Sequence, residues 1–209
     1  MVYLLLNTCG DPGVAALADE AGVLVEESLP GRGTSEHLMP AIRTLLASRG
    51  LTVRELAGVG LVIGPGSFTG VRVGLATAKG LCDAVGLGMV GMSRLALVAA
   101  SAARTGRVVA VLDGGRGEFY CGLYADGEMI GEELLKESAA RHWMADAEAV
   151  TCEARVGESL GIRIVREPGA EALREMFLAR VAAGTWSDVA TIDANYLRRT
   201  DAELLVKAK

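Results

Sequence analysis

The sequence is poor in aromatic side chains, histidine and net positive charge. Aromatic residues make up 4% of the 209 residues, and the only histidines, His37 and His142, lie far apart and form no His-x-x-x-His pair. They therefore lack the spacing of a metal site, and we expect no metal. The 21 Lys and Arg residues are outnumbered by 26 Asp and Glu residues, giving a net charge of −5. This balance argues against direct binding of nucleic acid, which requires clustered cations.

Cysteine pairs and long hydrophobic runs are also missing. No Cys-x-x-Cys spacing joins the four cysteines, which are Cys9, Cys82, Cys121 and Cys152. Reduced thiols are therefore expected rather than disulfides or zinc. The segment 87–103 comes closest to a membrane span, but Ser93 and Arg94 interrupt it. The amino terminus shows no basic leader or cleavage site, so we expect a cytoplasmic protein without membrane contact.

The composition that remains is that of a globular α/β protein. Hydrophobic residues make up 51% of the chain and charged residues 22%, which is enough to bury a core. Because aromatic residues are scarce, Val, Leu, Ile and Ala must fill that core, as they do in layered α/β proteins.

The most informative stretch is a glycine-rich loop at residues 64–70 that leads into a helix. An apolar, β-branched run at 58–63 precedes it and predicts a buried strand. Pro65 and the flanking glycines allow a sharp turn, and Ser67 or Thr69 can cap the helix that follows. The segment is therefore predicted to be strand, tight loop and helix.

The predicted helix has an unusual face of small residues. At about 100° per residue, Arg72 and Lys79 lie opposite the face formed by Gly70, Gly74, Thr77, Ala78 and Leu81. Two glycines inside a helix cost about 1 kcal/mol each, so we predict a seam on which a second helix packs closely.

A phosphate-binding role for the loop is the alternative, because the amide groups at a helix N-terminus attract anions. The loop lacks the Gly-Lys-Ser/Thr of a P-loop, since Val71 and Arg72 follow Gly70. Ser67 also lacks the flanking glycines of a nucleophile elbow. Packing is therefore the favoured interpretation.

The order of elements repeats along the chain. Three strands at 2–6, 14–18 and 23–28 precede helices that alternate with strands, and the scheme restarts with a strand at 108–112. We expect two similar mixed-sheet α/β lobes with a boundary near 104–106.

Residues 64–81 resemble the hallmark segment of the TsaB family, also called YeaZ. These proteins are the non-catalytic actin-like subunits of the bacterial machinery that makes threonylcarbamoyladenosine on tRNA. Segments at 112–120 and 194–198 are similar to two further family segments. The resemblance implies an actin-like, ribonuclease H-like fold of duplicated mixed-sheet lobes. Residues 1–104 would form the N-terminal lobe with the glycine loop and helix, and residues 105–209 a reduced C-terminal lobe.

The resemblance also implies the partners. The subunit would bind the catalytic paralogue TsaD through helices of the N-terminal lobe, join the ATPase TsaE in a larger assembly, and contact tRNA only indirectly. A homodimer through the same surface is the alternative without the partner. The chain would have no catalytic residues and no cofactor of its own, with ATP or ADP conceivable only at the partner interface. The expected interface residues are Leu38, Ile42, Leu45, Gly70, Val71, Gly74, Leu75 and Ala78.

Three residues mark a cleft expected to have lost its chemistry. In active members of the superfold the first hairpin carries an aspartate near the metal and phosphates of ATP, and Asn7 and Thr8 occupy the matching positions here. Asn7 brings no negative charge for Mg²⁺ and is typical of a tight turn. Asp113 ends a strand of the second half and either faces Asn7 or caps a turn. The rival function is a small ATP- or metal-dependent enzyme, either a kinase-like hydrolase or a glycoprotease-type peptidase.

Overall fold

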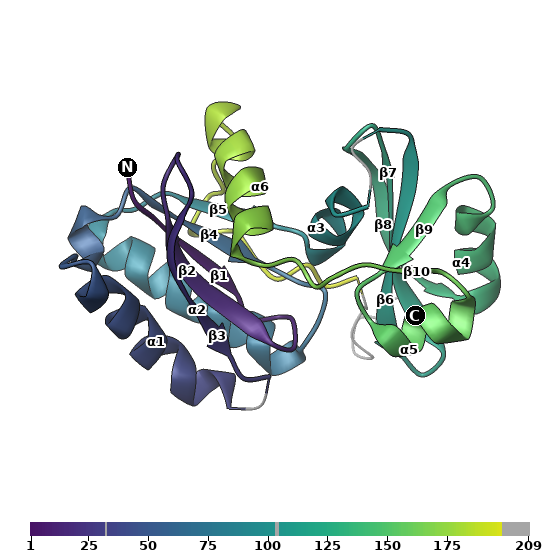
Figure 1. The fold of residues 1–209 in the computed structure, drawn as a ribbon, viewed down its shortest axis with the longest axis horizontal. Coiled ribbons are helices and arrows are strands. Elements are labelled where there is room, and N and C mark those ends of the chain that lie inside the picture. The colour runs from purple at the N-terminus through teal and green to yellow at the C-terminus, as the bar shows by residue number, and fades with distance from the viewer. Residues whose placement is uncertain (32, 103–104, 198–209) are drawn as a thin grey trace, which may run out of the picture.

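The computed structural model describes residues 1–31, 33–102 and 105–197. In these residues the chain forms two five-stranded mixed sheets side by side, each covered by helices on both faces (Figure 1). The expected fold of duplicated mixed-sheet lobes is confirmed.

The first sheet has the strand order β3-β2-β1-β4-β5. Its strands are β1 (Tyr3–Asn7), β2 (Gly13–Ala18), β3 (Val23–Leu29), β4 (Gly58–Val62) and β5 (Met89–Met92). The first three strands form an antiparallel meander, and β4 and β5 run parallel to β1. All residues of β1 and β4 are buried, as expected for central strands covered on both faces.

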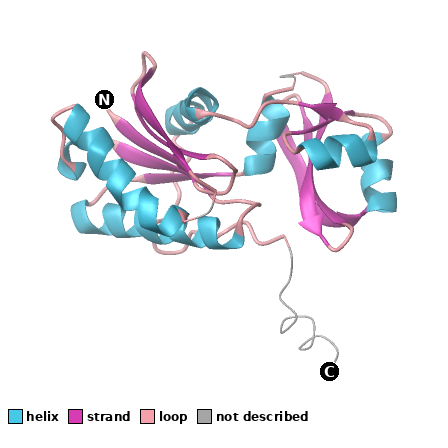
Figure 2. Cartoon of the chain, turned by 60° about the horizontal axis from the view of Figure 1, so that its bottom comes forward, coloured by secondary structure: helices cyan, strands magenta, loops and turns pink. Residues whose placement is uncertain are grey.

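Helices from both ends of the chain cover this first sheet. The helices α1 (Thr34–Ser48) and α2 (Phe68–Val85) lie side by side on one face, and α6 (Ala170–Ala182) lies on the other face (Figure 2). The predicted cap of α2 is confirmed, because Ser67 Oγ accepts a hydrogen bond of 3.2 Å from the Gly70 amide. A capping box formed by Thr52 and Glu55 begins the short 3₁₀ helix η1 (Val53–Glu55).

The second sheet repeats the first in both order and direction. Its order, β10-β9-β6-β7-β8, places three antiparallel strands beside two parallel ones, as in the first sheet. The strands are β6 (Arg107–Gly115), β7 (Glu118–Ala125), β8 (Glu128–Lys136), β9 (Glu148–Thr151) and β10 (Arg163–Ile164). The second lobe, expected to be reduced, therefore keeps all five strands. One helix, α5 (Ala154–Leu160), was not predicted.

Each half of the chain contributes one helix that packs on the sheet of the other half. The helix α3 (Arg94–Ala100) follows β5 in sequence but packs on the second sheet, where Leu95 and Val98 meet alternate residues of β6. On the opposite face of that sheet lie α4 (Glu137–Met144) and α5. In return, Phe177 of α6 is fully buried against the first sheet.

This packing divides the chain differently from the expected lobes 1–104 and 105–209. The first core also takes in Ala170, Leu173, Phe177 and Ala194, which come from the far end of the chain. Residues 103 and 104, at the expected boundary, lie outside the described residues. No helix in the described residues is long and apolar enough to cross a membrane.

Candidate functional site

The glycine face of α2 is covered by the chain itself. A methyl group on Gly70 would overlap the Thr8 carbonyl oxygen, and one on Gly74 would overlap Thr8 Oγ1. The glycines therefore let α2 approach the loop that follows β1. The prediction of a closely packed face was correct, but the prediction that a second helix, supplied by a partner, packs on it is wrong, because the loop at Thr8 covers the glycines. Helical periodicity groups the small residues on one face without showing what covers that face.

The other expected interface residues are also buried inside the chain. Each is at most 8% exposed, and the set comprises Leu38, Ile42, Leu45, Val71, Leu75 and Ala78. They attach α1 and α2 to the rest of the first lobe and are not free to meet a partner. The outward residues of α2 include Arg72, Ala76 and Gly80. The predicted outward position of Arg72 is thus confirmed, whereas Lys79 is half-buried and donates hydrogen bonds to the carbonyl groups of Ala190 and Ile192.

A cleft of about 610 Å³ opens between the two lobes. The loop after β1 and the glycine loop before α2 form one wall, and the start of α5 forms the opposite wall. The lining residues are Cys9, Gly10, Asp11, Gly31, Gly66, Ser67, Arg94, Asp113, Cys152, Glu153, Ala154, Arg155, Val156 and Glu167. This is where the expected nucleotide cleft would lie.

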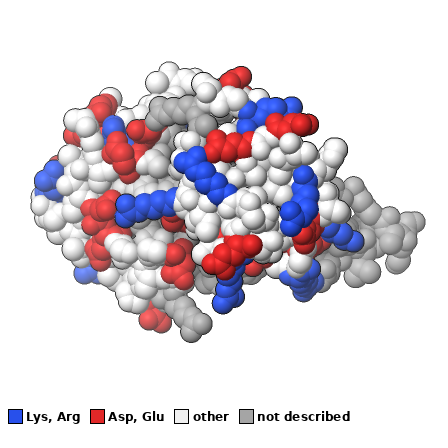
Figure 3. Space-filling model, turned by 45° about the vertical axis from the view of Figure 1, so that its right-hand side comes forward, with Lys and Arg blue, Asp and Glu red and all other residues white. Residues whose placement is uncertain are grey.

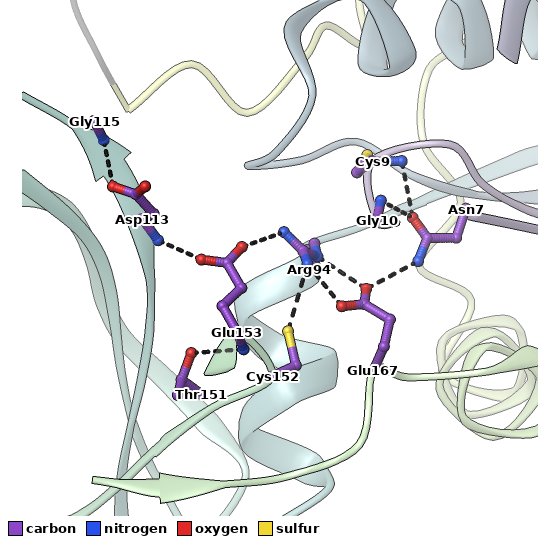
Figure 4. A network of polar contacts seen from close by, with 10 residues as sticks. All are labelled: Asn7, Cys9, Gly10, Arg94, Asp113, Gly115, Thr151, Cys152, Glu153 and Glu167. Carbon is purple, nitrogen blue, oxygen red and sulfur yellow. Dashed lines mark hydrogen bonds and ion pairs between the residues drawn. The ribbon is translucent and has the colours of Figure 1, made fainter. Parts of the chain in front are cut away.

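A buried arginine lines this cleft and lies at the centre of a network of polar contacts (Figure 4). Arg94 is 4% exposed and begins α3. Its Nε and Nη2 atoms donate to the two carboxylate oxygens of Glu167 at 2.9 and 2.7 Å, and its Nη1 atom donates to Glu153 at 3.1 Å. Nη2 also lies 3.4 Å from Cys152 Sγ. One cation thus bridges two carboxylates that come from the second half of the chain.

The charges of this network hold each other ionised. Burial by itself would raise the pKa of Glu167, but the hydrogen bonds and the charge of Arg94 outweigh it and lower that pKa below its ordinary value. Burial by itself would lower the pKa of Arg94, and Glu167 reverses the effect. The Cys9 thiol beside them is buried, which raises its pKa to about 12, and the pKa of the Cys152 thiol is raised for the same reason. Neither sulfur is an activated nucleophile at neutral pH.

The expected cleft residues Asn7 and Asp113 lie at opposite ends of this network (Figure 4). Asn7 Oδ1 accepts hydrogen bonds from the amides of Cys9 and Gly10 at 3.0 and 3.3 Å, and its Nδ2 lies 3.5 Å from Glu167 Oε1. At the other end, the Asp113 amide donates to Glu153 and the Asp113 carboxylate accepts from the Gly115 amide, both at 2.7 Å. The turn-forming interpretation of both residues is confirmed by these bonds.

Thr8 belongs to the wall of the first lobe rather than to the cleft. Its side chain is buried under α2, and among the described residues its hydroxyl has no hydrogen-bond partner. No group of three or more His, Cys, Asp or Glu residues in the described chain has the arrangement of a metal site.

Sequence reasoning missed Arg94, Glu153 and Glu167, although one signal was present. Arg94 interrupts an apolar run, and a cation in such a setting requires a partner when the run is buried. Its two partners are 59 and 73 residues further along the chain. Only the packing of the second lobe against α3 brings them together.

Comparison with known proteins places this geometry in a family. A family model described as TsaD, tRNA N6-adenosine threonylcarbamoyltransferase, matches residues 22–154, which is more than half of the chain. The Escherichia coli tRNA threonylcarbamoyladenosine biosynthesis protein TsaB is 31% identical over 131 residues, covering 61% of this chain and 57% of that protein. A Mycobacterium tuberculosis protein is 30% identical over 179 residues, covering 85% of this chain and 81% of its own length. The match thus spans less than two thirds of E. coli TsaB.

A solved structure supports the same relationship. YeaZ from Pseudomonas aeruginosa has a TM-score of 0.74 and 26% sequence identity, and the match covers 94% of this chain and 99% of the YeaZ chain. Two mixed-sheet lobes of identical strand order that enclose a cleft define an actin-like protein. Within that class, the chain belongs to the TsaB (YeaZ) family.

Proposed function

We propose that this chain is a non-catalytic subunit in the formation of threonylcarbamoyladenosine on tRNA. It binds a TsaD-like catalytic paralogue and holds that enzyme in a competent shape, and a TsaE-like ATPase joins the larger assembly. It needs no metal or nucleotide of its own. The names of its relatives support a role in threonylcarbamoyladenosine biosynthesis. The ion pairs that Arg94 forms in the cleft support the non-catalytic role.

The observation that carries the proposal is the ion-pair network in the cleft. A carbon placed on Gly10 would lie 2.5 Å from Glu167 Oε1, so the Glu167 carboxylate already occupies the space against the loop after β1. The only buried cation of the network, Arg94, is neutralised by two carboxylates. A triphosphate entering here would meet negative charge from Glu153 and Glu167, which opposes its binding.

The outward face of α1 and α2 is the proposed docking surface. It carries exposed apolar residues, with Met39 42% and Phe68 62% exposed, beside the small residues Ala76 and Gly80. A stable protein interface buries about 1,600 Å² in total, and two adjacent helices can supply its centre. Without the partner, a second copy of this chain is the natural occupant of the same face.

Indirect contact with tRNA is consistent with the charge distribution. On the face drawn in Figure 3, basic and acidic side chains are interspersed rather than gathered into a basic field. Because phosphate binding depends on clustered cations, we propose that the partner, not this chain, holds the tRNA.

The test is a substitution on each face of the first lobe. Ala76→Arg places a long cation on the outer face of α2, whereas Ala179→Arg makes the same change at an exposed position of α6, on the opposite face of the sheet. We expect Ala76→Arg to abolish co-purification with the TsaD-like paralogue and to stop tRNA modification, while Ala179→Arg changes neither. Equal binding by both variants would refute the docking surface, and modification without this chain would refute the subunit role.

The size of the cleft favours one alternative, an ATP-dependent enzyme. Calorimetry of the isolated chain with ATP and Mg²⁺ separates the two functions. The proposed function predicts no measurable heat of binding. Micromolar binding that Asp113→Asn abolishes would favour the enzyme.

A further inference from the structure

An arginine near the start of α2 lies against two exposed aromatic rings, and none of these three residues lines the cleft. The Cζ atom of Arg72 lies 3.3 Å from the centroid of the Phe68 ring and 5.6 Å from that of the Tyr196 ring. Its Nε atom donates a hydrogen bond of 2.9 Å to the Tyr196 hydroxyl. We call these three residues the arginine–aromatic cluster.

The cluster is built by the fold rather than by chance contact of long side chains. Phe68 is the first residue of α2, so Arg72 lies one turn further on the same side of the helix. Tyr196 comes from the far end of the chain and is held in place by its neighbour Asn195, whose amide donates to the Ile63 carbonyl at 2.8 Å. Asn195 Nδ2 also donates to Glu132 at 2.5 Å. The guanidinium is therefore oriented before any ligand arrives.

The cluster leaves part of its binding capacity unused. Among the described residues, the two terminal nitrogens of Arg72 have no hydrogen-bond acceptor and no carboxylate within ion-pair distance. Phe68 is 62% exposed and Tyr196 48% exposed, which is a large apolar surface to leave in water. Arginine, tyrosine and other aromatic residues are the residue types that dominate the binding energy of protein interfaces.

An oriented guanidinium with two free nitrogens fits a carboxylate, which can accept two parallel hydrogen bonds. The rings on either side would exclude water and so strengthen that pair. A nucleic-acid phosphate is the less suitable ligand, because it is held by groups of cations. The next cation along α2, Lys79, already donates to two backbone carbonyl groups.

We propose that the arginine–aromatic cluster is a receptor for one aspartate or glutamate side chain of the partner protein. This inference rests on the proposed function, because the cluster adjoins the docking surface on α2. It specifies the chemistry of the contact: an acidic residue, flanked by apolar atoms that cover Phe68 and Tyr196.

The test measures the affinity of the full chain for the purified TsaD-like paralogue by calorimetry. Arg72→Lys keeps the charge but loses the planar guanidinium that can donate two parallel hydrogen bonds. We expect this variant to weaken binding at least tenfold. Arg141→Lys makes the same change at an exposed position of α4, in the second lobe and outside the docking surface, and should change the affinity less than twofold. Tyr196→Phe, which removes the acceptor for Nε, should weaken binding several-fold. Thermal unfolding of each variant checks that it is folded.

A charge-reversal screen identifies the carboxylate. Arg72→Glu should abolish binding, and one Asp→Arg or Glu→Arg variant of the paralogue should restore it. Unchanged binding by Arg72→Lys and Arg72→Glu, with loss of binding by Ala76→Arg, would overturn the receptor and leave the proposed function intact. Absence of binding by the unmodified chain would overturn the proposed function. Unchanged affinity for the paralogue with weaker binding of tRNA by the complex would show a phosphate site, and would also overturn the proposal.

Discussion

The guanidinium of Arg94 donates to both carboxylate oxygens of Glu167, across the boundary between the two lobes. Arg94 begins the helix that crosses from the first sheet to the second, and Glu167 lies in the segment that returns from β10 to α6. The pair therefore joins the two places where the chain passes between lobes. The pair lines the cleft and ties the start of α3 to the segment that leads into α6.

Removing the cation should destabilise the fold strongly. Arg94→Met leaves two carboxylates in a cleft with no compensating charge, and we expect the free energy of unfolding to fall by about 3–5 kcal/mol. Urea denaturation measures the change. The matched control is Arg141→Gln, which breaks an exposed pair with Glu137 on α4 and should cost at most about 1 kcal/mol. Equal losses in the two variants would show that the buried network contributes no more to stability than an exposed ion pair does.

The same network predicts how stability depends on pH. The pKa of Glu167 is lower in the folded chain than its ordinary value of 4.5, because the bonds from Arg94 outweigh the opposing effect of burial. Its contribution to stability is therefore present above about pH 4.5 and is lost as the pH falls through the lower folded pKa. The difference in unfolding free energy between the natural chain and Glu167→Gln should be largest near neutrality and shrink in acid. A difference that grows toward low pH would contradict this sign.

Replacing either of two glycines of α2 by alanine should change the stability of the chain, but in opposite directions. Gly74→Ala drives a methyl group into Thr8 and should destabilise the chain by about 1–3 kcal/mol. Gly80→Ala meets no atom within 4 Å and should stabilise the helix by about 0.5–1 kcal/mol. Thermal or urea unfolding of the two variants measures both effects. If Gly74→Ala is tolerated as well as Gly80→Ala, then α2 does not pack on the loop after β1 as described.

A second polar cluster should hold the lobes together on the side of β8. Glu132 of that strand accepts hydrogen bonds from Ser93 and Asn195, both at 2.5 Å, and from Tyr124. Glu132→Ala leaves these donors without an acceptor, so we expect a loss of about 1–3 kcal/mol. Hydrogen exchange of the Asn195 amide should also become faster, because the segment loses its tie to the second lobe. Glu133→Ala, at the exposed next position, is the control, and equal exchange in both variants would contradict the role of Glu132.

How far the sequence predicts this protein is clearest on α2. Its helical spacing correctly groups Gly70, Gly74 and Ala78 on one face and correctly places Arg72 outside. It does not show that Thr8 covers the glycines, because a wheel records directions around one helix and not the neighbour in each direction. The expected partner interface was wrong for this reason.

The cleft shows the same limit in another way. Asn7 and Asp113 were predictable because each lies near the end of a strand and bonds to its own turn. Arg94, Glu153 and Glu167 were not, because their meeting depends on the crossing of α3 between the sheets. The return of α6 to the first sheet could not be predicted either, because the local spacing of its residues does not show which sheet it covers.

By itself, the sequence determined the strands, the glycine loop and helix, the repeated order of elements and the family. These follow from local spacing and turn chemistry, which act over a few residues. Tertiary structure alone decided that the small face of α2 lies inward, that each lobe is covered by a helix from the other half, and that one arginine neutralises two distant carboxylates. Those outcomes depend on which surfaces meet when both sheets exclude water, and no local pattern specifies that choice.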